Sequence, residues 1–281
     1  MSYENRLPPE GINVSRTNVL AEIFWMLAGF VGSVLALAVV LWLAGGFIAS
    51  RLPFSWEETL AGHVVGPAEE SAQSAVLQKL ADQLAKDIET DVRFHLIYVD
   101  DDEVNAYATL GGIITIHRGL IDRLHSENAL AFVIAHEMGH VLHRDPARAM
   151  GGGLLLGMAL MAFGVASDMD SMTSLAKNAI SLTMLDFSRE EERHADETAL
   201  QLVGKHYGHL NGSREVFEEI MAYETEALHG FSIPEFLSSH PETKSRTDRI
   251  AETANTLNLP LEGKLTPLPT LAGKTPESGK N

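Results

Sequence analysis

Residues 131–143 read AFVIAHEMGHVLH, and the five residues at 136–140 form the pattern HExxH. The run follows Ser126, a residue type that caps helices, so we predict a helix over 126–143. Side chains four residues apart lie on one face of a helix, so both imidazoles can reach one zinc ion. Glu137 then lies beside the open position of the metal, where it can take a proton from a zinc-activated water molecule and pass it to a leaving amine. The pattern therefore predicts a hydrolytic metal centre.

The two histidines of the pattern, His136 and His140, supply two ligands. Zinc hydrolases need a third protein ligand and an open fourth position. His143 follows His140 by three residues, which is too close along the helix to share the ion easily. We therefore expect His143 in the outer shell of the site or in solvent. The alternative interpretation is a helix that carries surface histidines and no metal.

A second candidate segment is the acidic stretch at 188–196, SREEERHAD. Most glutamate-rich stretches are solvated helix faces, and this interpretation stays open here. Glu192 and Asp196 are four residues apart and share a helical face, so one can be a ligand and the other an acceptor that orients a ligand imidazole. Spacing alone does not separate Glu192 from Glu190 or Glu191 as the third ligand.

An uncharged run of 28 residues occupies 23–50, with the sequence IFWMLAGFVGSVLALAVVLWLAGGFIAS. About 20 helical residues cross the hydrocarbon core of a bilayer, and Trp25 and Trp42 near the ends suit its interfaces. A cleavable signal peptide is the alternative. Its apolar part is about 7–15 residues long, however, and this run follows a polar lead of 22 residues. We predict a retained anchor that spans the bilayer once.

The net charge of the chain is confined to the part that follows the anchor. Of the 281 residues, 38 are acidic and 21 are basic, which gives a net charge of −17. Residues 1–51 contain three of each kind, so 52–281 carries the whole excess. This balance argues against a nucleic-acid partner, because phosphate contacts need concentrated Lys and Arg. The sequence has no cysteine, which excludes disulfides, thiolate zinc sites and a cysteine nucleophile.

Basic residues in the flanks of a membrane helix indicate its orientation. Arg6, Arg16 and the amino terminus lie on the leading side, whereas Arg51 on the trailing side is followed by Glu57 and Glu58. This bias of one or two charges favours a cytoplasmic amino terminus and a main domain on the other side of the membrane.

Periodicity and composition organise the rest of the chain. A second uncharged run, at 149–167, is 19 residues long and rich in glycine, and we expect a buried or membrane-grazing helical hairpin there. A second span would instead place the two halves of the metal site on opposite sides of the membrane. The other predicted elements are helices within 68–91 and over 189–203, 213–229 and 241–257, and strands over 92–99, 105–109 and 113–117.

These motifs together give the chain a clear resemblance to a known family. Over roughly residues 70–255 it resembles the M48 family of zinc metallopeptidases, because HEMGH corresponds to the family's HExxH and the stretch at 188–196 matches its SRxxExxAD motif. The resemblance implies that Glu192 is the third ligand of one Zn²⁺ per chain, beside His136 and His140. It also implies that Asp196 is the carboxylate that orients a ligand imidazole.

Two further segments carry the resemblance. The first implies an edge strand beside the zinc that holds extended substrate through main-chain hydrogen bonds. Its matching residues are Asn105, Ala106, Tyr107, Gly111 and Gly112. The second, His240-Pro241 followed by Arg246, resembles the family's HPxxxxR element, and implies that His240 and Arg246 are catalytic side chains that can donate to an oxyanion. The ordinary alternatives are a solvated histidine and an arginine that pairs with a helix carboxylate.

The sequence departs from the family pattern at two places. Tyr107 stands where the family has Phe, and Asp145 stands where a second His often follows the Arg. Neither change touches the implied ligands. The change at Asp145 leaves open how the helix end after Arg144 is held.

The predicted fold is α+β and mostly helical: a zincin-like (gluzincin) metallopeptidase domain with a small β-sheet and one N-terminal transmembrane helix. The predicted organisation is a polar segment at 1–22, the anchor at 23–50, the metallopeptidase domain at 51–257 and a disordered tail at 258–281. The chain is predicted to be a single-pass protein of the bacterial inner membrane, and the flanking charges favour an extracytoplasmic catalytic domain.

The predicted function is a membrane-anchored zinc metalloendopeptidase that hydrolyses peptide bonds by metal-activated water in protein quality control. The expected partners are unfolded or misassembled proteins and, through 23–50, the lipid bilayer. The alternative is a chaperone or assembly factor that captures extended polypeptide on the edge strand, with slow or gated proteolysis. A structural membrane protein without a cofactor is a third hypothesis, and it would predict no stoichiometric metal.

Overall fold

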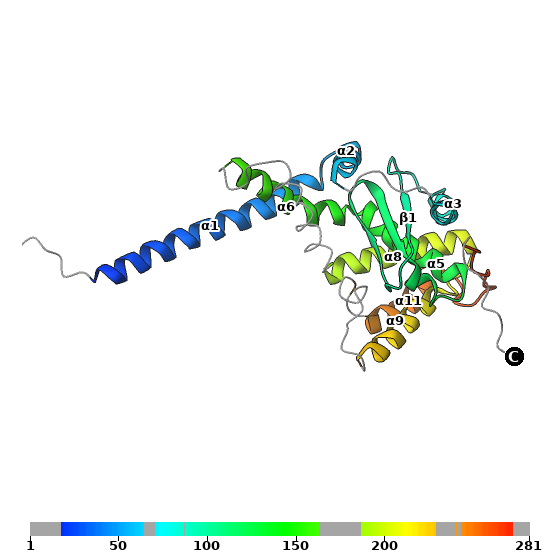
Figure 1. Cartoon of the computed structure of the whole chain (residues 1–281). Helices are drawn as coiled ribbons and strands as arrows, with labels where there is room; N and C mark the ends of the chain where they lie inside the picture. The colour runs from blue at the N-terminus through cyan, green and yellow to red at the C-terminus, as the bar shows by residue number, and fades with distance from the viewer. Residues whose placement is uncertain are drawn as a thin grey trace, which may run out of the picture. The chain divides into compact units, whose positions relative to one another are not determined.

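The computed structural model describes residues 18–64, 71–86, 88–162, 187–228, 240 and 243–271, which are coloured in Figure 1. The chain divides into two compact units, one that ends at Leu41 and one that begins at Trp42. Within the described residues, the first unit consists of the apolar part of one helix. The second unit contains every other described element, including the predicted metal ligands.

Helix α1 (Val19–Ala49) contains the predicted anchor except for its last residue. It has a mean hydropathy of 2.4 over its most apolar window, and it is the one helix of the described residues that is long and apolar enough to cross a membrane. Its large apolar side chains are exposed, among them Trp25 and Trp42. Exposed apolar side chains along a whole helix are unfavourable in water and favourable in a bilayer, which fits the predicted anchor.

A small three-stranded sheet forms one layer of the second unit. Its strands are β1 (His95–Val99), β2 (Ala106–Ala108) and β3 (Ile113–His117), in the order β1-β3-β2. β1 pairs with β3 in parallel, and β2 pairs with β3 in antiparallel register with Tyr107 opposite Thr115. β2 therefore stands at an edge of this sheet.

A glycine bend lets β2 turn back to pair with β3. The two strands are joined through a short 3₁₀ turn, η1 (Leu110–Gly112), in which both Gly111 and Gly112 have a φ of 74°. Residues with a side chain rarely adopt this left-handed conformation. A Cβ on Gly112 would also clash with the carbonyl oxygen of Arg93. The tight bend predicted from the glycine pair is confirmed.

Two helices that pack along each other form the centre of the unit: α5 (Glu127–Leu142) and α8 (Arg189–Tyr207). Ser126 caps α5 by accepting a hydrogen bond from the Ala129 amide, as the sequence predicts. The close approach of the two helices depends on a glycine, because a Cβ on Gly139 would lie 2.9 Å from the Ala195 Cα. This contact brings HExxH and the acidic stretch face to face.

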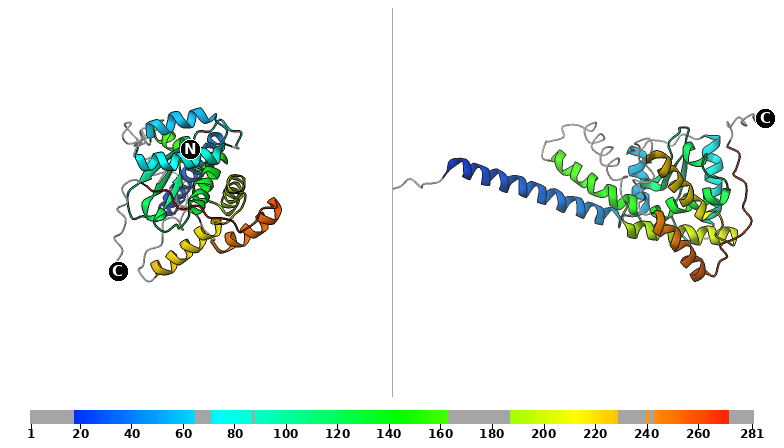
Figure 2. Two further views of the ribbon diagram at one scale, coloured as in Figure 1. Left: turned by 90° about the vertical axis from the view of Figure 1, so that its right-hand side faces the viewer. Right: turned by 90° about the horizontal axis from the view of Figure 1, so that it is seen from below.

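Shorter helices surround this pair and complete a mostly helical fold. α9 and α11 pack against each other, as the yellow and orange helices of Figure 2 show. The bounds are α2 (Phe54–Val64), α3 (Ala72–Ala85), α4 (Arg118–Ile121), α9 (Ser213–Leu228) and α11 (Thr243–Leu257). A mostly helical domain with a small sheet confirms the predicted fold class.

Helix α6 (Asp145–Ala162) begins within three residues of the end of α5. The sharp turn between the two helices is made by Arg144, whose φ of 63° is unusual for a residue with a side chain. The start of α6 contacts the end of α1, where a Cβ on Gly45 would clash with the backbone of Gly151. α6 covers part of the predicted hairpin at 149–167, and the remainder of that prediction lies outside the described residues.

Residues 258–271, the first part of the tail predicted to be disordered at 258–281, follow the helical core as an extended segment. The Glu127 amide donates to the Thr266 carbonyl, and the Leu210 amide donates to the Pro260 carbonyl. Leu271 is buried. The composition suggested a tail because Pro, Thr, Gly and Lys dominate it, but its leucines pack on the apolar core. Residues 272–281 lie outside the described part of the chain.

Candidate metal centre

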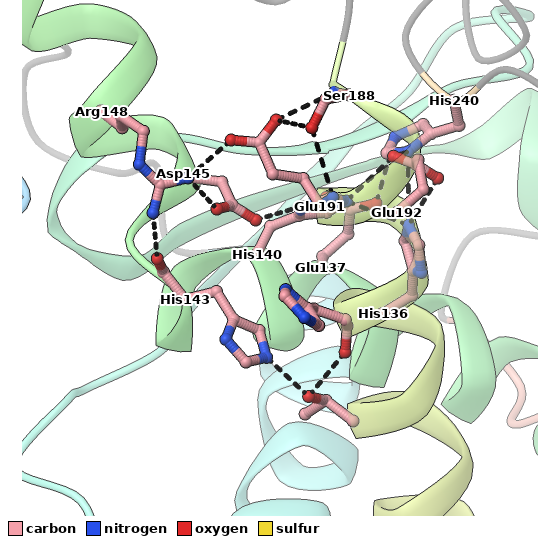
Figure 3. A network of polar contacts seen from close by, with 12 residues as sticks. His136, Glu137, His140, His143, Asp145, Arg148, Ser188, Glu191, Glu192 and His240 are labelled. Carbon is pink, nitrogen blue, oxygen red and sulfur yellow. Dashed lines mark hydrogen bonds and ion pairs between the residues drawn. The ribbon is translucent and has the colours of Figure 1, made fainter. Parts of the chain in front are cut away.

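Helix α5 carries three of the predicted site residues into the interior of the unit. His136, Glu137 and His140 are all buried, with exposed fractions of 2% or less. The Nε2 atoms of the two imidazoles lie 3.1 Å apart, which is the convergence that the four-residue spacing predicts. Figure 3 shows both rings on the side of α5 that faces α8.

Helix α8 adds the carboxylate of Glu192. Its Oε1 lies 3.3 Å from the His140 Nε2, and its Oε2 lies 3.6 Å from the His136 Nε2. The neighbouring glutamates do not reach the centre: Glu190 pairs with Arg193 at the surface, and Glu191 caps the start of α8. The packing of α8 on α5 therefore selects one glutamate from three that spacing could not separate.

A fourth side chain, His240, joins this group from outside the two central helices. Its Nδ1 lies 2.8 Å from the Glu192 Oε1 and 3.3 Å from the His136 Nε2. Its Nε2 lies 3.6 Å from the Glu137 Oε1. His136, His140, Glu192 and His240 each offer one donor atom within 4.8 Å of the others, so they could hold a metal ion. The sequence predicted His240 near the cleft, but not within the donor group.

One carboxylate and one arginine support the first imidazole. Asp196 Oδ1 lies 3.1 Å from the His136 Nδ1, at the position that the family resemblance implies. Arg246 on α11 donates to both oxygens of Asp196, at 2.7 and 2.9 Å, and its Nη1 lies 2.6 Å from the Glu192 Oε2. Burial raises the pKa of Asp196, but Arg246 and the contact with His136 together hold that pKa below its usual value.

The second imidazole has a matching support that sequence reasoning missed. Asp145 Oδ2 lies 2.9 Å from the His140 Nδ1, and both side chains are almost fully buried. Arg148, one turn along α6, holds the other oxygen of Asp145 at 3.0 Å and reaches Glu191 at 2.6 Å (Figure 3). The departure from the family pattern at position 145 was the signal that could have pointed to this contact.

Charges around the donor group favour a cation at its centre. Burial raises the pKa of Glu192, yet His240 and Arg246 hold that pKa well below its usual value, so Glu192 is ionised. Burial lowers the pKa of His140, but its hydrogen bonds to Asp145 and Glu192 raise that pKa to about 10. An imidazole held this strongly by carboxylates is in a site that attracts positive charge.

The donor set fits a zinc ion. Each ligand imidazole directs Nδ1 at a carboxylate, so Nε2 is the ring nitrogen that faces the centre. Histidine ligands of zinc usually have such a carboxylate partner at their other nitrogen. A zinc–nitrogen bond is about 2.0–2.1 Å long, so two Nε2 atoms that are 3.1 Å apart are close enough to be ligands of the same ion. Neither oxygen of the buried Glu137 has a hydrogen-bond partner among the described residues. Such a carboxylate can accept a hydrogen bond from water or substrate.

The predicted substrate strand packs against the helix that carries HExxH. β2, which contains Ala106 and Tyr107, contacts α5. Asn105 precedes it and accepts a hydrogen bond from the His117 amide through its carbonyl oxygen, while its side chain donates to Glu103 and not to the donor group. His143 is also outside that group, because its Nε2 pairs with the Thr198 hydroxyl.

Comparison with known proteins agrees with this geometry. The sequence model of peptidase family M48 matches residues 67–254. The beta-barrel assembly-enhancing proteases of Escherichia coli (strain K12) and Yersinia pestis are 28% and 29% identical to the chain over 179 and 176 residues. These matches cover 59% and 58% of this chain, and 34% and 35% of the relatives. The mitochondrial metalloendopeptidase OMA1 of Schizosaccharomyces pombe is 26% identical over 164 residues, 58% of this chain and 47% of that protein. The chain thus spans about a third to a half of the length of these relatives.

Proposed function

The chain belongs to peptidase family M48, and on this basis we propose that it is a membrane-anchored zinc metalloendopeptidase that acts in protein quality control. The observation that carries the proposal is the convergence of His136, His140 and Glu192 from two helices, beside the buried carboxylate of Glu137. The names of the relatives, a metalloendopeptidase and an assembly-enhancing protease, support hydrolysis of protein substrates.

In this proposal His136, His140 and Glu192 hold the zinc ion. Zinc would supply Lewis acidity, which lowers the pKa of a water molecule from about 15.7 to about 7 and polarises the scissile carbonyl. Glu137 accepts the proton of the attacking water and delivers it to the leaving amine. Its carboxylate is suited to this task because it is held on the same helix turn as the two histidines and no hydrogen bond to a described residue occupies it.

Two carboxylates orient the ligands. Asp196 and Asp145 each accept from the Nδ1 of one imidazole, so that Nε2 is the nitrogen of each ring that is directed to the metal position. Arg246 binds Asp196 and Glu192 and lies fully inside the network, so we assign it a positioning role instead of the oxyanion donation expected from the sequence. Hydrogen bonds and ion pairs of this kind are strongest where water is excluded.

Of the two side chains expected to donate to an oxyanion, His240 has the more suitable position. Its Nε2 lies on the Glu137 side of the centre, where charge develops as water attacks a carbonyl. Its Nδ1, however, belongs to the donor group, and a fourth protein ligand would fill the position that a zinc hydrolase keeps open. This single observation favours the alternative function, an assembly factor or chaperone with slow or gated proteolysis.

The substrate is proposed to be an unfolded or misassembled protein. An extended segment could pair with the open side of β2, where main-chain hydrogen bonds tolerate many sequences. The contact of β2 with α5 would place such a segment beside the metal ligands. The residues of this proposed edge are Asn105, Ala106 and Tyr107, with Gly111 and Gly112 shaping the bend that follows.

The location proposed for the chain is the bacterial inner membrane, with residues 23–50 as a single span. Support comes from the length, hydropathy and exposed apolar surface of α1. The charges in its flanks favour an extracytoplasmic catalytic domain. The domain would then meet proteins of the cell envelope at the membrane surface.

A comparison of the full-length protein with its Glu137→Gln variant tests the proposed mechanism. Both proteins are expected to bind about one zinc ion, measured by mass spectrometry of the metal, because Glu137 is not a ligand. Cleavage of a fluorescently labelled unfolded protein is expected to fall by about 10³-fold in the variant, in the range of general acid–base contributions. Glu190→Gln is the matched control, since it makes the same change at an exposed position outside the centre.

Three outcomes distinguish the hypotheses. Retained cleavage by the Glu137→Gln variant would overturn the assigned base. A variant without cleavage that still restores a deletion strain would favour the assembly-factor function. Absence of stoichiometric zinc in the wild-type protein would favour a structural role.

A further inference from the structure

A pocket of about 670 Å³ lies where the end of α1 meets the start of α6. Its walls come from two segments of the second unit, 42–51 and 143–148, and it does not include the metal centre. We propose that this pocket binds the phosphate group of an anionic phospholipid. The inference rests on the proposed membrane anchor, but not on proteolytic activity.

The charge of the pocket favours an anion. Three arginines, Arg51, Arg144 and Arg148, line it, and no carboxylate does. Arg144 is balanced by Glu57, and the carboxylates that balance Arg148 are those of the metal-centre network. Within the described residues, the ion pairs of the structure include none for Arg51, so this arginine contributes about one uncompensated positive charge. One charge matches a phosphodiester, which carries one negative charge.

Donor geometry supports the same ligand. The guanidinium of Arg51 lies 3.4 Å from the centre of the Phe47 ring, and its Nη1 donates to the Phe47 carbonyl at 3.0 Å. These contacts hold the planar group against the helix and leave its other N–H donors available for phosphate oxygens. Such pre-ordering reduces the entropy lost on binding.

The position of the pocket along the chain points to a lipid as the source of the phosphate. Trp42 and Phe47 are exposed apolar walls of the pocket, and they belong to the last turns of the apolar run that ends at Ser50. An indole at the end of a spanning helix marks the depth of the lipid headgroups. A phospholipid at that depth could place its phosphate by Arg51 and its chains along the apolar surface of α1.

Close backbone contact keeps the pocket in shape. A Cβ on Gly46 would lie 2.6 Å from the Arg148 carbonyl oxygen, so the two walls are joined without intervening side chains. Arg144 adds hydrogen bonds from its Nη2 to the carbonyl oxygen of Leu52, just beyond the end of α1. The arginines therefore project from a fixed junction instead of from two independent helices.

Quenching of Trp42 fluorescence by brominated lipids tests the proposal. The full-length protein, with Trp25 and Trp56 replaced by Phe, is placed in phosphatidylcholine nanodiscs that contain equal fractions of brominated phosphatidylglycerol or brominated phosphatidylcholine. Measurements at about 0.5 M salt suppress diffuse attraction, because the screening length is then only a few ångströms. We expect about fivefold preference for phosphatidylglycerol, the upper size of effect for one direct ion pair at a surface.

Variants and competitors decide the interpretation. Arg51→Gln is expected to remove the preference, Arg51→Lys to retain part of it, and Arg16→Gln, which removes a charge from the other flank, to leave it unchanged. Equal quenching by both lipids, or a preference that survives Arg51→Gln, would overturn the lipid site. Displacement of brominated phosphatidylglycerol by inorganic phosphate would overturn the lipid as the source. If neither lipid quenches Trp42, the proposed anchor itself is wrong.

Discussion

The two ligand imidazoles are held by two arms that use the same chemistry in different surroundings. The Asp196 arm comprises His136, Asp196 and Arg246, and the Asp145 arm comprises His140, Asp145 and Arg148. Each arm runs from an imidazole Nδ1 to a carboxylate and on to an arginine. The side chain of Arg246 is 2% exposed, whereas that of Arg148 is 46% exposed and also reaches Glu191.

The electrostatic consequence differs between the arms. Burial, joined by the nearby charge of Arg246, lowers the pKa of His136, despite its hydrogen bond to Asp196. Burial also lowers the pKa of His140, but the hydrogen bonds to Asp145 and Glu192 reverse the effect. The Asp196 arm is therefore a fully buried part of the core, whereas the Asp145 arm connects the metal centre to the surface near the end of α1.

The largest expected difference concerns stability. Arg246→Met leaves the buried carboxylates of Asp196 and Glu192 without their shared cation, and the loss expected for a broken buried pair is about 3–5 kcal/mol. Arg148→Met removes a half-exposed guanidinium, for which we expect about 1 kcal/mol or less. Denaturant unfolding of the metal-free proteins in detergent, followed by circular dichroism, measures both. Equal losses in the free energy of unfolding would show that the burial of Arg246 adds nothing to its contribution to stability.

A second test concerns His240, which contacts Glu192, the ligand that stands between the arms. His240→Ala is expected to keep its zinc and to lose about 10²-fold in turnover, the usual effect of deleting one oxyanion donor. Steady-state cleavage of a peptide substrate together with metal analysis provides the measurement. A rise in turnover would instead identify His240 as a removable fourth ligand.

The arms are expected to be equivalent in their effect on metal affinity. Asp196→Asn and Asp145→Asn should each weaken zinc binding by about 10–100-fold, measured by competition with a chromogenic chelator. Asparagine has nearly the size of aspartate and keeps one acceptor oxygen, so both variants remove the carboxylate charge without leaving a cavity. A loss of affinity in Asp196→Asn alone would reduce Asp145 to a structural residue, and recovery in Asp145→Glu would support its positioning role.

The smallest effect is expected just outside the Asp145 arm. His143 lies between His140 and the arm's own carboxylate in sequence, but it is exposed and pairs with Thr198. His143→Ala should therefore change zinc affinity by no more than about twofold, as for other surface substitutions. A tenfold loss in the same chelator competition would mean that the arm extends further along the helix end than its contacts indicate.

The ligands and the carboxylate of the Asp196 arm could be predicted from the sequence, whereas the Asp145 arm had only the departure from the family pattern at position 145 as a signal. Helical spacing places His136 and His140 on one face, and the family motif names Glu192 and Asp196. The contact of Asp145 depends on the left-handed turn at Arg144, and an arginine gives no signal for that conformation.

Tertiary packing explains the other differences. Only the approach of α8 to α5 separates Glu192 from its neighbours, because helical spacing says nothing about which face meets another helix. Arg246 was expected either to donate to an oxyanion or to pair with a helix carboxylate, and in the structure its guanidinium contacts two buried carboxylates. The ordered segment at 258–271 was expected to be disordered because its apolar residues are sparse, and they gain order from a surface that the local sequence does not contain.

The glycine contact between α1 and α6 determines where a soluble fragment can begin. A fragment that begins after the apolar run, at residue 52, would lack the helix end that Gly151 contacts and the Ala49 carbonyl that Arg144 binds. It would also leave the first turns of α6, which lead from Asp145, exposed to water. Crystallisation or assay of this domain therefore calls for a start at Trp42, with a detergent or a solubilising partner to cover the last turns of the anchor.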